Sequence, residues 1–172
     1  IDAYKKAILL KPDYAMAYSN LGNALKDIGK YNQAIEAYNK ALSIDPNYSD
    51  PYYNMGNAFK DQGRLKEAID AYENFISLNP NLPIVYNNMG NALKDQGKID
   101  KAIDAYNKAI SLDPNFALAH SNKGIDLKDI GKTEEAIKSY KKALAIEPDY
   151  AETHLNLSFM LLNSGKLKEG LD

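Results

Sequence analysis

The sequence predicts an all-α fold, a solenoid of antiparallel helix pairs, and three residue types that recur at one interval carry this prediction. In the chain of 172 residues they lie 34 positions apart: Gly22, Gly56, Gly90 and Gly124; Tyr4, Tyr38, Tyr72, Tyr106 and Tyr140; Pro12, Pro46, Pro80, Pro114 and Pro148. A fixed interval of this length is typical of stacked two-helix units. One such unit cannot bury its apolar face alone, so neighbouring units must stack.

The interval divides the chain, expected to be a single array, into four complete repeats and two partial ones. Residues 1–14 form the second half of a repeat, residues 15–48, 49–82, 83–116 and 117–150 form full repeats, and residues 151–172 form a truncated one. We number each repeat from position 1 to position 34. Position 1 is Ala15, Ser49, Pro83, Ala117 and Ala151 in turn.

The first helix of each repeat is expected to end at the glycine of position 15, because glycine readily takes the left-handed conformation that closes a helix. These glycines are Gly29, Gly63, Gly97, Gly131 and Gly165. Positions 4, 7, 8 and 11 form the apolar stripe of this helix, and in the first full repeat they are Tyr18, Leu21, Gly22 and Leu25. The small residue at position 8 allows another helix to approach closely.

The second helix is expected to begin near position 18 and to end before the Asp-Pro, Asn-Pro or Glu-Pro pair at positions 31–32. Proline cannot continue a helix and restricts the residue before it. The matching apolar stripe lies at positions 20, 21, 24, 27 and 28, which are Ala34, Ile35, Tyr38, Ala41 and Leu42 in the first full repeat. Residues 1–14 supply one more helix of this second kind, and residues 151–172 begin with a helix of the first kind.

This pattern resembles the tetratricopeptide repeat along the whole chain: an aromatic residue at position 4, Leu or Met before Gly at 7–8, Gly at 15, Ala at 20, Tyr at 24, Ala at 27 and Pro at 32. The departures are Phe75 at position 27, Lys123 at position 7, Ser158 at position 8 and Gly170 at position 20. The resemblance implies a right-handed superhelix in which the first helices line a concave groove.

Asparagines recur on the face of the first helix that the apolar stripe does not use. Position 6 is Asn20, Asn54, Asn88, Asn122 and Asn156; position 9 is Asn23, Asn57 and Asn91, then Ile125 and Phe159. Asparagine is a poor helix former, but its carboxamide can pair with a peptide N–H and a peptide C=O together. Asparagines spaced by one repeat, roughly 10 Å apart, are therefore predicted to bind an extended peptide in the groove.

The asparagine row is similar to one in the repeats of the O-linked N-acetylglucosamine transferase family. The sequence of those repeats resembles residues 20–26 of this chain. That resemblance implies binding of a substrate peptide or an adaptor by Asn20, Asn54, Asn88, Asn122 and Asn156, and it does not imply transferase activity. Three alternatives remain open. The asparagines can be solvated residues copied with the repeats, the chain can be a structural, self-assembling solenoid, or it can be the recognition arm of a larger enzyme such as a glycosyltransferase.

Lysine and aspartate also recur side by side. Position 12 is Lys26, Lys60, Lys94 and Lys128, and position 13 is Asp27, Asp61, Asp95 and Asp129. We expect the lysine of one repeat to pair with the aspartate of the next, as exposed ion pairs worth about 0–1 kcal/mol each. Contact of Lys26, Lys60 and Lys94 with the peptide is the alternative role.

Composition argues against several other functions. A formal net charge of −2 disfavours a nucleic-acid binder. Without cysteine, an apolar run of about 20 residues or a signal peptide, the expected location is cytoplasmic, with no membrane partner. His120 and His154, both at position 4, are expected to be partly buried packing residues. No catalytic motif is present, so we predict a protein that is not an enzyme and needs no metal or cofactor.

The last repeat is more apolar. Ile125 and Phe159 replace asparagine at position 9, and Leu155 and Leu162 occupy positions 5 and 12. These residues are expected either to form a patch for a partner or to be covered by a further helix. Because the two partial repeats together make about one complete repeat, head-to-tail self-association at high concentration is also expected.

Overall fold

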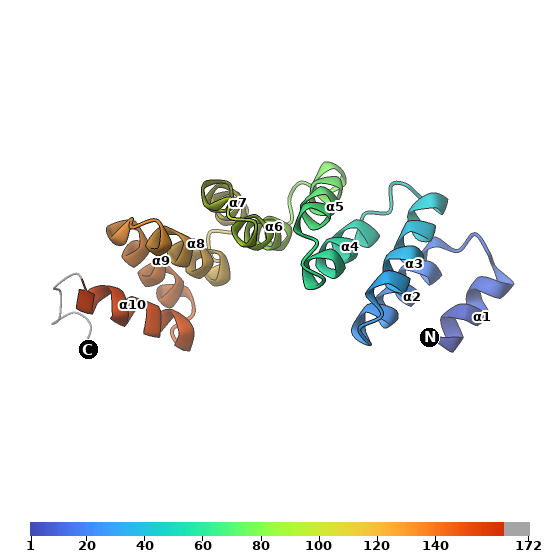
Figure 1. Cartoon of the computed structure of the whole chain (residues 1–172), viewed down its shortest axis with the longest axis horizontal. Coiled ribbons are helices and arrows are strands. Elements are labelled where there is room, and N and C mark those ends of the chain that lie inside the picture. Colours follow the sequence, from blue (N-terminus) through green and yellow to red (C-terminus); the bar gives the residue numbers. More distant parts are fainter. Residues whose placement is uncertain (164–172) are drawn as a thin grey trace. The chain divides into compact units, whose positions relative to one another are not determined.

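The computed structural model describes residues 1–163 and shows ten helices in this part of the chain (Figure 1). They are α1 (Asp2–Leu10), α2 (Ala15–Asp27), α3 (Tyr31–Ile44), α4 (Asp50–Asp61), α5 (Leu65–Leu78), α6 (Pro83–Asp95), α7 (Ile99–Leu112), α8 (Ala117–Asp129), α9 (Thr133–Ile146) and α10 (Ala151–Asn163). No residue from 1 to 163 lies in a strand. The predicted all-α class of repeated helix pairs is confirmed. Gly165 and Gly170 lie outside the described residues.

The helices fall into two units, Ile1–Asn81 and Leu82–Asp172. In the first unit, α2 pairs with α3 and α4 pairs with α5, while α3 also packs on α4 and α1 packs on α2. In the second unit, α6 pairs with α7 and α8 pairs with α9, while α7 packs on α8 and α9 packs on α10. The first helices of successive repeats also meet, α2 with α4 and α6 with α8.

Glycine ends the first helix of each full repeat in the way the sequence predicts. Gly29, Gly63, Gly97 and Gly131 have positive φ angles of 74°, 72°, 78° and 77°. The residue after each glycine donates its backbone N–H back into the helix, for example from Lys98 to the carbonyl oxygen of Leu93 at 2.9 Å. The left-handed glycine therefore satisfies carbonyl groups at the helix end and starts the turn into the second helix.

A buried tyrosine against a glycine holds each helix pair together. Tyr38, Tyr72, Tyr106 and Tyr140, all at position 24, have no exposed side-chain surface. A Cβ atom added to Gly90 would lie 2.5 Å from Cε1 of Tyr106. The predicted close approach at position 8 is confirmed, and the group that approaches is the tyrosine ring of the same repeat.

The alanines at positions 20 and 27 complete this core. Ala34, Ala68, Ala102 and Ala136 at position 20 are fully buried. At position 27, Phe75 is buried as well, and its ring lies 5.8 Å from that of Tyr53. None of the helices in residues 1–163 combines the length and the apolar character needed to span a lipid bilayer.

Candidate functional site

The asparagines of position 6 keep part of their surface exposed in every repeat. Asn20 and Asn54 lie on α2 and α4 of the first unit, and Asn88, Asn122 and Asn156 lie on α6, α8 and α10 of the second. All five are half-buried. Each asparagine therefore retains some surface that solvent or a ligand can reach.

Two of these asparagines are joined through a third amide that the sequence analysis missed. Nδ2 of Asn122 donates to Oδ1 of Asn87 at 2.9 Å, and Nδ2 of Asn87 makes a longer contact of 3.5 Å with Oδ1 of Asn88. Asn87 lies at position 5 and is fully buried. Its only signal in the sequence is an amide at a position that holds serine in two other repeats, Ser19 and Ser121.

The asparagines of position 9 have a structural partner inside their own repeat. Oδ1 of Asn23 accepts the hydroxyl proton of Tyr38 at 2.8 Å, and the same bond joins Tyr72 to Asn57 at 2.7 Å and Tyr106 to Asn91 at 2.8 Å. These asparagines therefore also have a structural role, because each satisfies the polar end of a core tyrosine. The bond also fixes the carboxamide, since its oxygen must point inward.

The fourth full repeat lacks this bond. Ile125 replaces asparagine at position 9 and packs beside a buried cluster that includes Leu127 and Tyr140. Within the described part of the chain, the buried hydroxyl group of Tyr140 has no hydrogen-bond partner. Burial raises the pKa of the Tyr140 hydroxyl, and the carboxylates of Asp129 and Asp126 act in the same direction.

Asp126, the next residue on α8, is a buried carboxyl group whose two oxygens have no hydrogen-bond partner among residues 1–163. Burial raises its pKa to about 6, the nearby Lys94 ammonium lowers it, and Asp129 and Asp95 raise it further. The other repeats have Ala24, Ala58 and Ala92 at this position. The carboxyl group therefore imposes a desolvation cost on one repeat that the other three avoid.

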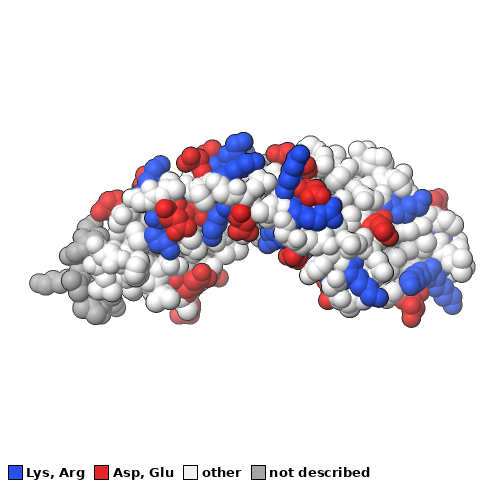
Figure 2. Space-filling model, viewed as in Figure 1, with Lys and Arg blue, Asp and Glu red and all other residues white. Residues whose placement is uncertain are grey.

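The lysines of position 12 do not pair as expected. Nζ of Lys26 lies 3.7 Å from Oδ1 of Asp27, and Nζ of Lys128 lies 3.8 Å from Oδ1 of Asp129, so both pairs join neighbours in one helix. In the described ranges, no ion pair within 4 Å joins position 12 of one repeat to position 13 of the next, which corrects that expectation. Lys60 and Lys94 are half-buried. Acidic and basic side chains are interspersed on the face shown in Figure 2.

The two histidines contact the prolines that end the preceding helices. Nε2 of His120 lies 3.1 Å from the carbonyl oxygen of Pro114, and Nε2 of His154 lies 2.6 Å from that of Pro148. A carbonyl oxygen can only accept, so Nε2 carries the proton in both rings. His120 is half-buried as predicted, whereas His154 is exposed, which corrects the expectation of burial at that site.

The apolar residues of the last repeat are exposed on α10. The exposed fractions are 73% for Leu155, 57% for Phe159 and 46% for Leu162. On α1, Leu9 and Leu10 are exposed by 81% and 77%. Exposed apolar side chains that lie together form contact surfaces for other molecules more often than single scattered ones do.

Comparison with known proteins gives one family. The family model described as "TPR repeat" matches residues 1–29, 22–63, 56–97 and 126–165, and the one described as "Tetratricopeptide repeat" matches residues 83–116. A search of curated proteins gave no match.

Solved structures with the same fold include two of MamA. One is 35% identical, covers 88% of this chain and 88% of that chain, and has a TM-score of 0.82. The other is 26% identical, covers 91% and 86%, and has a TM-score of 0.83. The crystal structure of YrrB, described as a TPR protein with an unusual peptide-binding site, is 24% identical, covers 98% and 87%, and has a TM-score of 0.80.

Proposed function

The chain belongs to the tetratricopeptide repeat family, and from that premise we propose that it is a non-enzymatic scaffold that binds a protein partner. The partner contributes an extended segment, and the asparagines of position 6 hydrogen-bond to its backbone. The observation that carries this proposal is a half-buried asparagine at the same point of the first helix in all five repeats. YrrB has a peptide-binding site, which supports the same class of ligand here.

Each unit contributes its own set of amides. Asn20 and Asn54 serve in the first unit, and Asn88, Asn122 and Asn156 serve in the second. In the second unit, the buried amide of Asn87 holds Asn122 in place and lies beside Asn88. Pre-organised amides lose less conformational entropy on binding than mobile ones, so this pair is the firmest part of the proposed surface.

The asparagines of position 9 act mainly as donors in this proposal. Because Oδ1 of Asn23, Asn57 and Asn91 accepts a tyrosine hydroxyl proton, peptide contacts fall to the amide hydrogens, which suit peptide carbonyl oxygens. Lys26, Lys60 and Lys94, three positions further along the helix, add cationic side chains beside the segment. Recognition through the backbone tolerates many peptide side chains.

Alanine substitution of two position-6 asparagines tests the proposal. We expect the double variant Asn54→Ala, Asn88→Ala to bind unstructured peptides about 30-fold more weakly than the parent chain, because each of the two lost amides removes about 1 kcal/mol of hydrogen bonding. Fluorescence anisotropy with a panel of labelled peptides measures this, and the loss should be similar for all peptide sequences. N-methylation of the peptide backbone should weaken binding to the parent chain as well.

The matched control is Asn107→Ala, which removes an exposed asparagine from α7, a second helix of a repeat. It should leave peptide affinity unchanged. Equal affinities for the parent chain and the double variant would contradict the proposal and favour asparagines copied without a binding role. Thermal melts should show little loss of stability in either variant, since alanine is the better helix former.

A further inference from the structure

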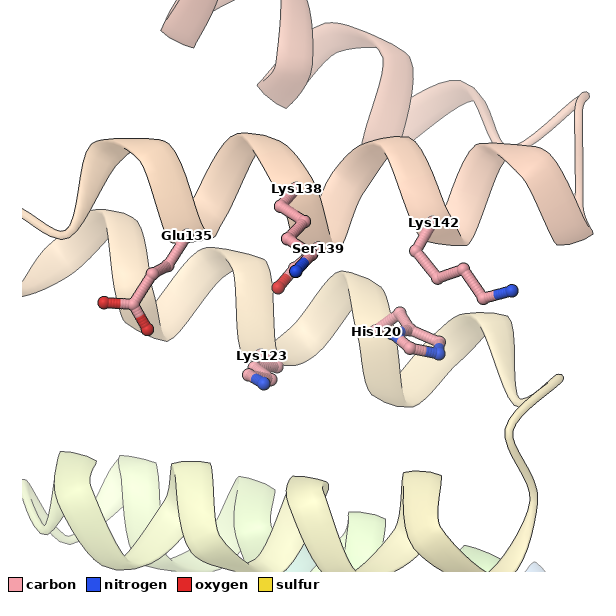
Figure 3. Close-up of a pocket in the computed structure, with 6 residues that line it drawn as sticks. All are labelled: His120, Lys123, Glu135, Lys138, Ser139 and Lys142. Carbon is pink, nitrogen blue, oxygen red and sulfur yellow. The ribbon is translucent and has the colours of Figure 1, made fainter.

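A pocket of about 240 Å³ lies between α8 and α9 in the fourth full repeat. Its walls are His120 and Lys123 from α8 and Glu135, Lys138, Ser139 and Lys142 from α9. Figure 3 shows these six side chains on the same side of the two adjacent helices. Three lysines and one glutamate are therefore among the residues that line the pocket.

The same place in the third repeat has different chemistry. There, a pocket between α6 and α7 is lined mostly by the corresponding repeat positions, including Tyr86, Met89, Asp104 and Ala105. In the fourth repeat these four residues become His120, Lys123, Lys138 and Ser139. Position 7 is Leu21, Met55 or Met89 and position 22 is Glu36, Asp70 or Asp104 in the earlier repeats. Lysine replaces an apolar and an acidic group at these two positions, while at position 19 Lys101 of the third repeat is replaced by Glu135. The fourth-repeat pocket therefore has three lysines and one acidic residue, against two lysines and one acidic residue in the third.

The protein offsets only part of the positive charge in this pocket, through the carboxylate of Glu135. The ion pairs found within 4 Å across residues 1–163 do not include Lys123, Lys138 or Lys142. Lys123 is half-buried, and burial lowers the pKa of its ammonium group, whereas Glu135 raises it and Lys138 lowers it. Ser139 is only 7% exposed. A half-buried lysine without an ion-pair partner is costly unless an anion compensates it.

We propose that this pocket binds a phosphate group. With three lysines and one glutamate, the pocket has an excess of about two positive charges, which matches the charge of a phosphate monoester near neutral pH. The lysines supply point charges, and the hydroxyl group of Ser139 supplies a neutral donor. The volume exceeds that of a single small anion, so the phosphate can be free or carried by a side chain of a protein partner.

The phosphate pocket is separate from the asparagine row. Lys123 follows Asn122 directly, and successive side chains of a helix point about 100° apart, so the two residues serve different surfaces. Phosphate binding therefore goes beyond the proposed function and does not depend on it. A failure of the Asn54→Ala, Asn88→Ala test leaves the pocket untouched.

Calorimetric titration of the whole chain tests the proposal with three probes: inorganic phosphate, a phosphoserine peptide and its unphosphorylated twin. We expect the first or the second to bind, and the third to bind much more weakly. Lys123→Met and Lys138→Asp give the fourth repeat the residues of the third, and each should weaken binding about tenfold or more, since hydrogen bonds to charged groups are the stronger ones.

Lys141→Met is the control, because it removes the same charge from an exposed site on α9 outside the pocket. It should bind phosphate as the parent chain does. Binding should also move the NMR signals of the His120 ring and raise the melting temperature of the parent chain but not of Lys123→Met. Melting of each variant without ligand verifies that it is folded.

Preference for inorganic phosphate would identify a small anion as the ligand, and preference for the phosphoserine peptide would identify a phosphorylated partner; both support the pocket. No binding of either probe, or equal binding by the parent chain and by Lys123→Met, would overturn it.

Discussion

Single residues explain how the fourth full repeat differs from the other three while keeping the same fold. Tyr38, Tyr72 and Tyr106 each bury a ring and place the hydroxyl group on an asparagine, whereas Tyr140 buries the same ring beside Ile125. A hydrogen-bonded buried hydroxyl stabilises a protein modestly, and an unpaired one costs more than it contributes. Comparing the four tyrosines therefore isolates the effect of the hydrogen bond on a buried hydroxyl group.

Removing the tyrosine hydroxyl groups should separate these cases. We expect Tyr72→Phe and Tyr106→Phe to lower the free energy of unfolding by about 1 kcal/mol each, because each removes the hydrogen bond from the tyrosine hydroxyl group to an asparagine oxygen. Tyr140→Phe should cause no loss or a small gain. Urea unfolding followed by circular dichroism measures the difference, and an equal loss at Tyr140 would show that its hydroxyl group has a partner after all.

Asp126 should make stability depend on pH. Its folded pKa of about 6 lies above the ordinary value of 3.8, so protonation stabilises the fold. This contribution is fully present below about pH 4 and is lost as the pH rises through about 6. Asp126→Ala, which restores the residue of the other repeats, should raise the free energy of unfolding by about 1–3 kcal/mol at pH 7.

The same substitution should have a smaller effect at pH 4, where Asp126 is protonated in the folded state and no longer carries a buried charge. Comparing parent and variant at each pH cancels the titration of all other carboxyl groups. A benefit that is constant across this range would contradict the assignment.

At the scale of the helix pair, the glycines of position 8 and of position 15 have different structural roles. Gly90 sits inside α6, where the ring of Tyr106 occupies the space of a side chain, and Gly97 ends that helix with a φ of 78° and nothing within 4 Å of an added Cβ. One glycine is needed for space and the other for backbone conformation. Alanine should therefore be tolerated better than asparagine at Gly90, and asparagine better than alanine at Gly97.

We expect Gly90→Ala to destabilise the chain by about 1–3 kcal/mol through overpacking, and Gly90→Asn to cost more. At Gly97, alanine should cost about 1–2 kcal/mol, and asparagine should cost less, because it tolerates positive φ. Urea unfolding of the four variants tests this. The same order of alanine and asparagine at both sites would refute the distinction.

At the scale of the whole molecule, the exposed apolar residues of α1 and α10 bear on assembly. Leu9, Leu10, Leu155 and Phe159 are each more than half exposed, and covering them would remove apolar surface from water. Association between α10 of one copy and α1 of another remains a prediction, and such a contact between different surfaces can propagate.

Light scattering should show a mass that grows with protein concentration. The double variant Leu155→Lys, Phe159→Lys should remain monomeric over the same range, because charges replace the apolar contact. Lys141→Met, elsewhere on the surface, should behave as the parent chain. A parent chain that stays monomeric at millimolar concentration would count against self-association.

The sequence by itself determined the repeat interval, the helix ends and the core. Gly97, Pro114 and Tyr106 act through local backbone preference and through a fixed place in the repeat, so their effects can be worked out from spacing alone. The position-6 asparagines were also evident from recurrence, and their ligand remains a proposal.

Only the tertiary structure decided which polar groups meet. The bond of Tyr106 to Asn91, the bond of Asn122 to buried Asn87, and the pairing of Lys26 with its own neighbour depend on distances of a few ångströms between side chains. The pocket around Lys123 likewise needs α8 and α9 side by side. A hydrogen bond is sensitive to tenths of an ångström and to direction, whereas a repeat pattern records only which face a residue lies on.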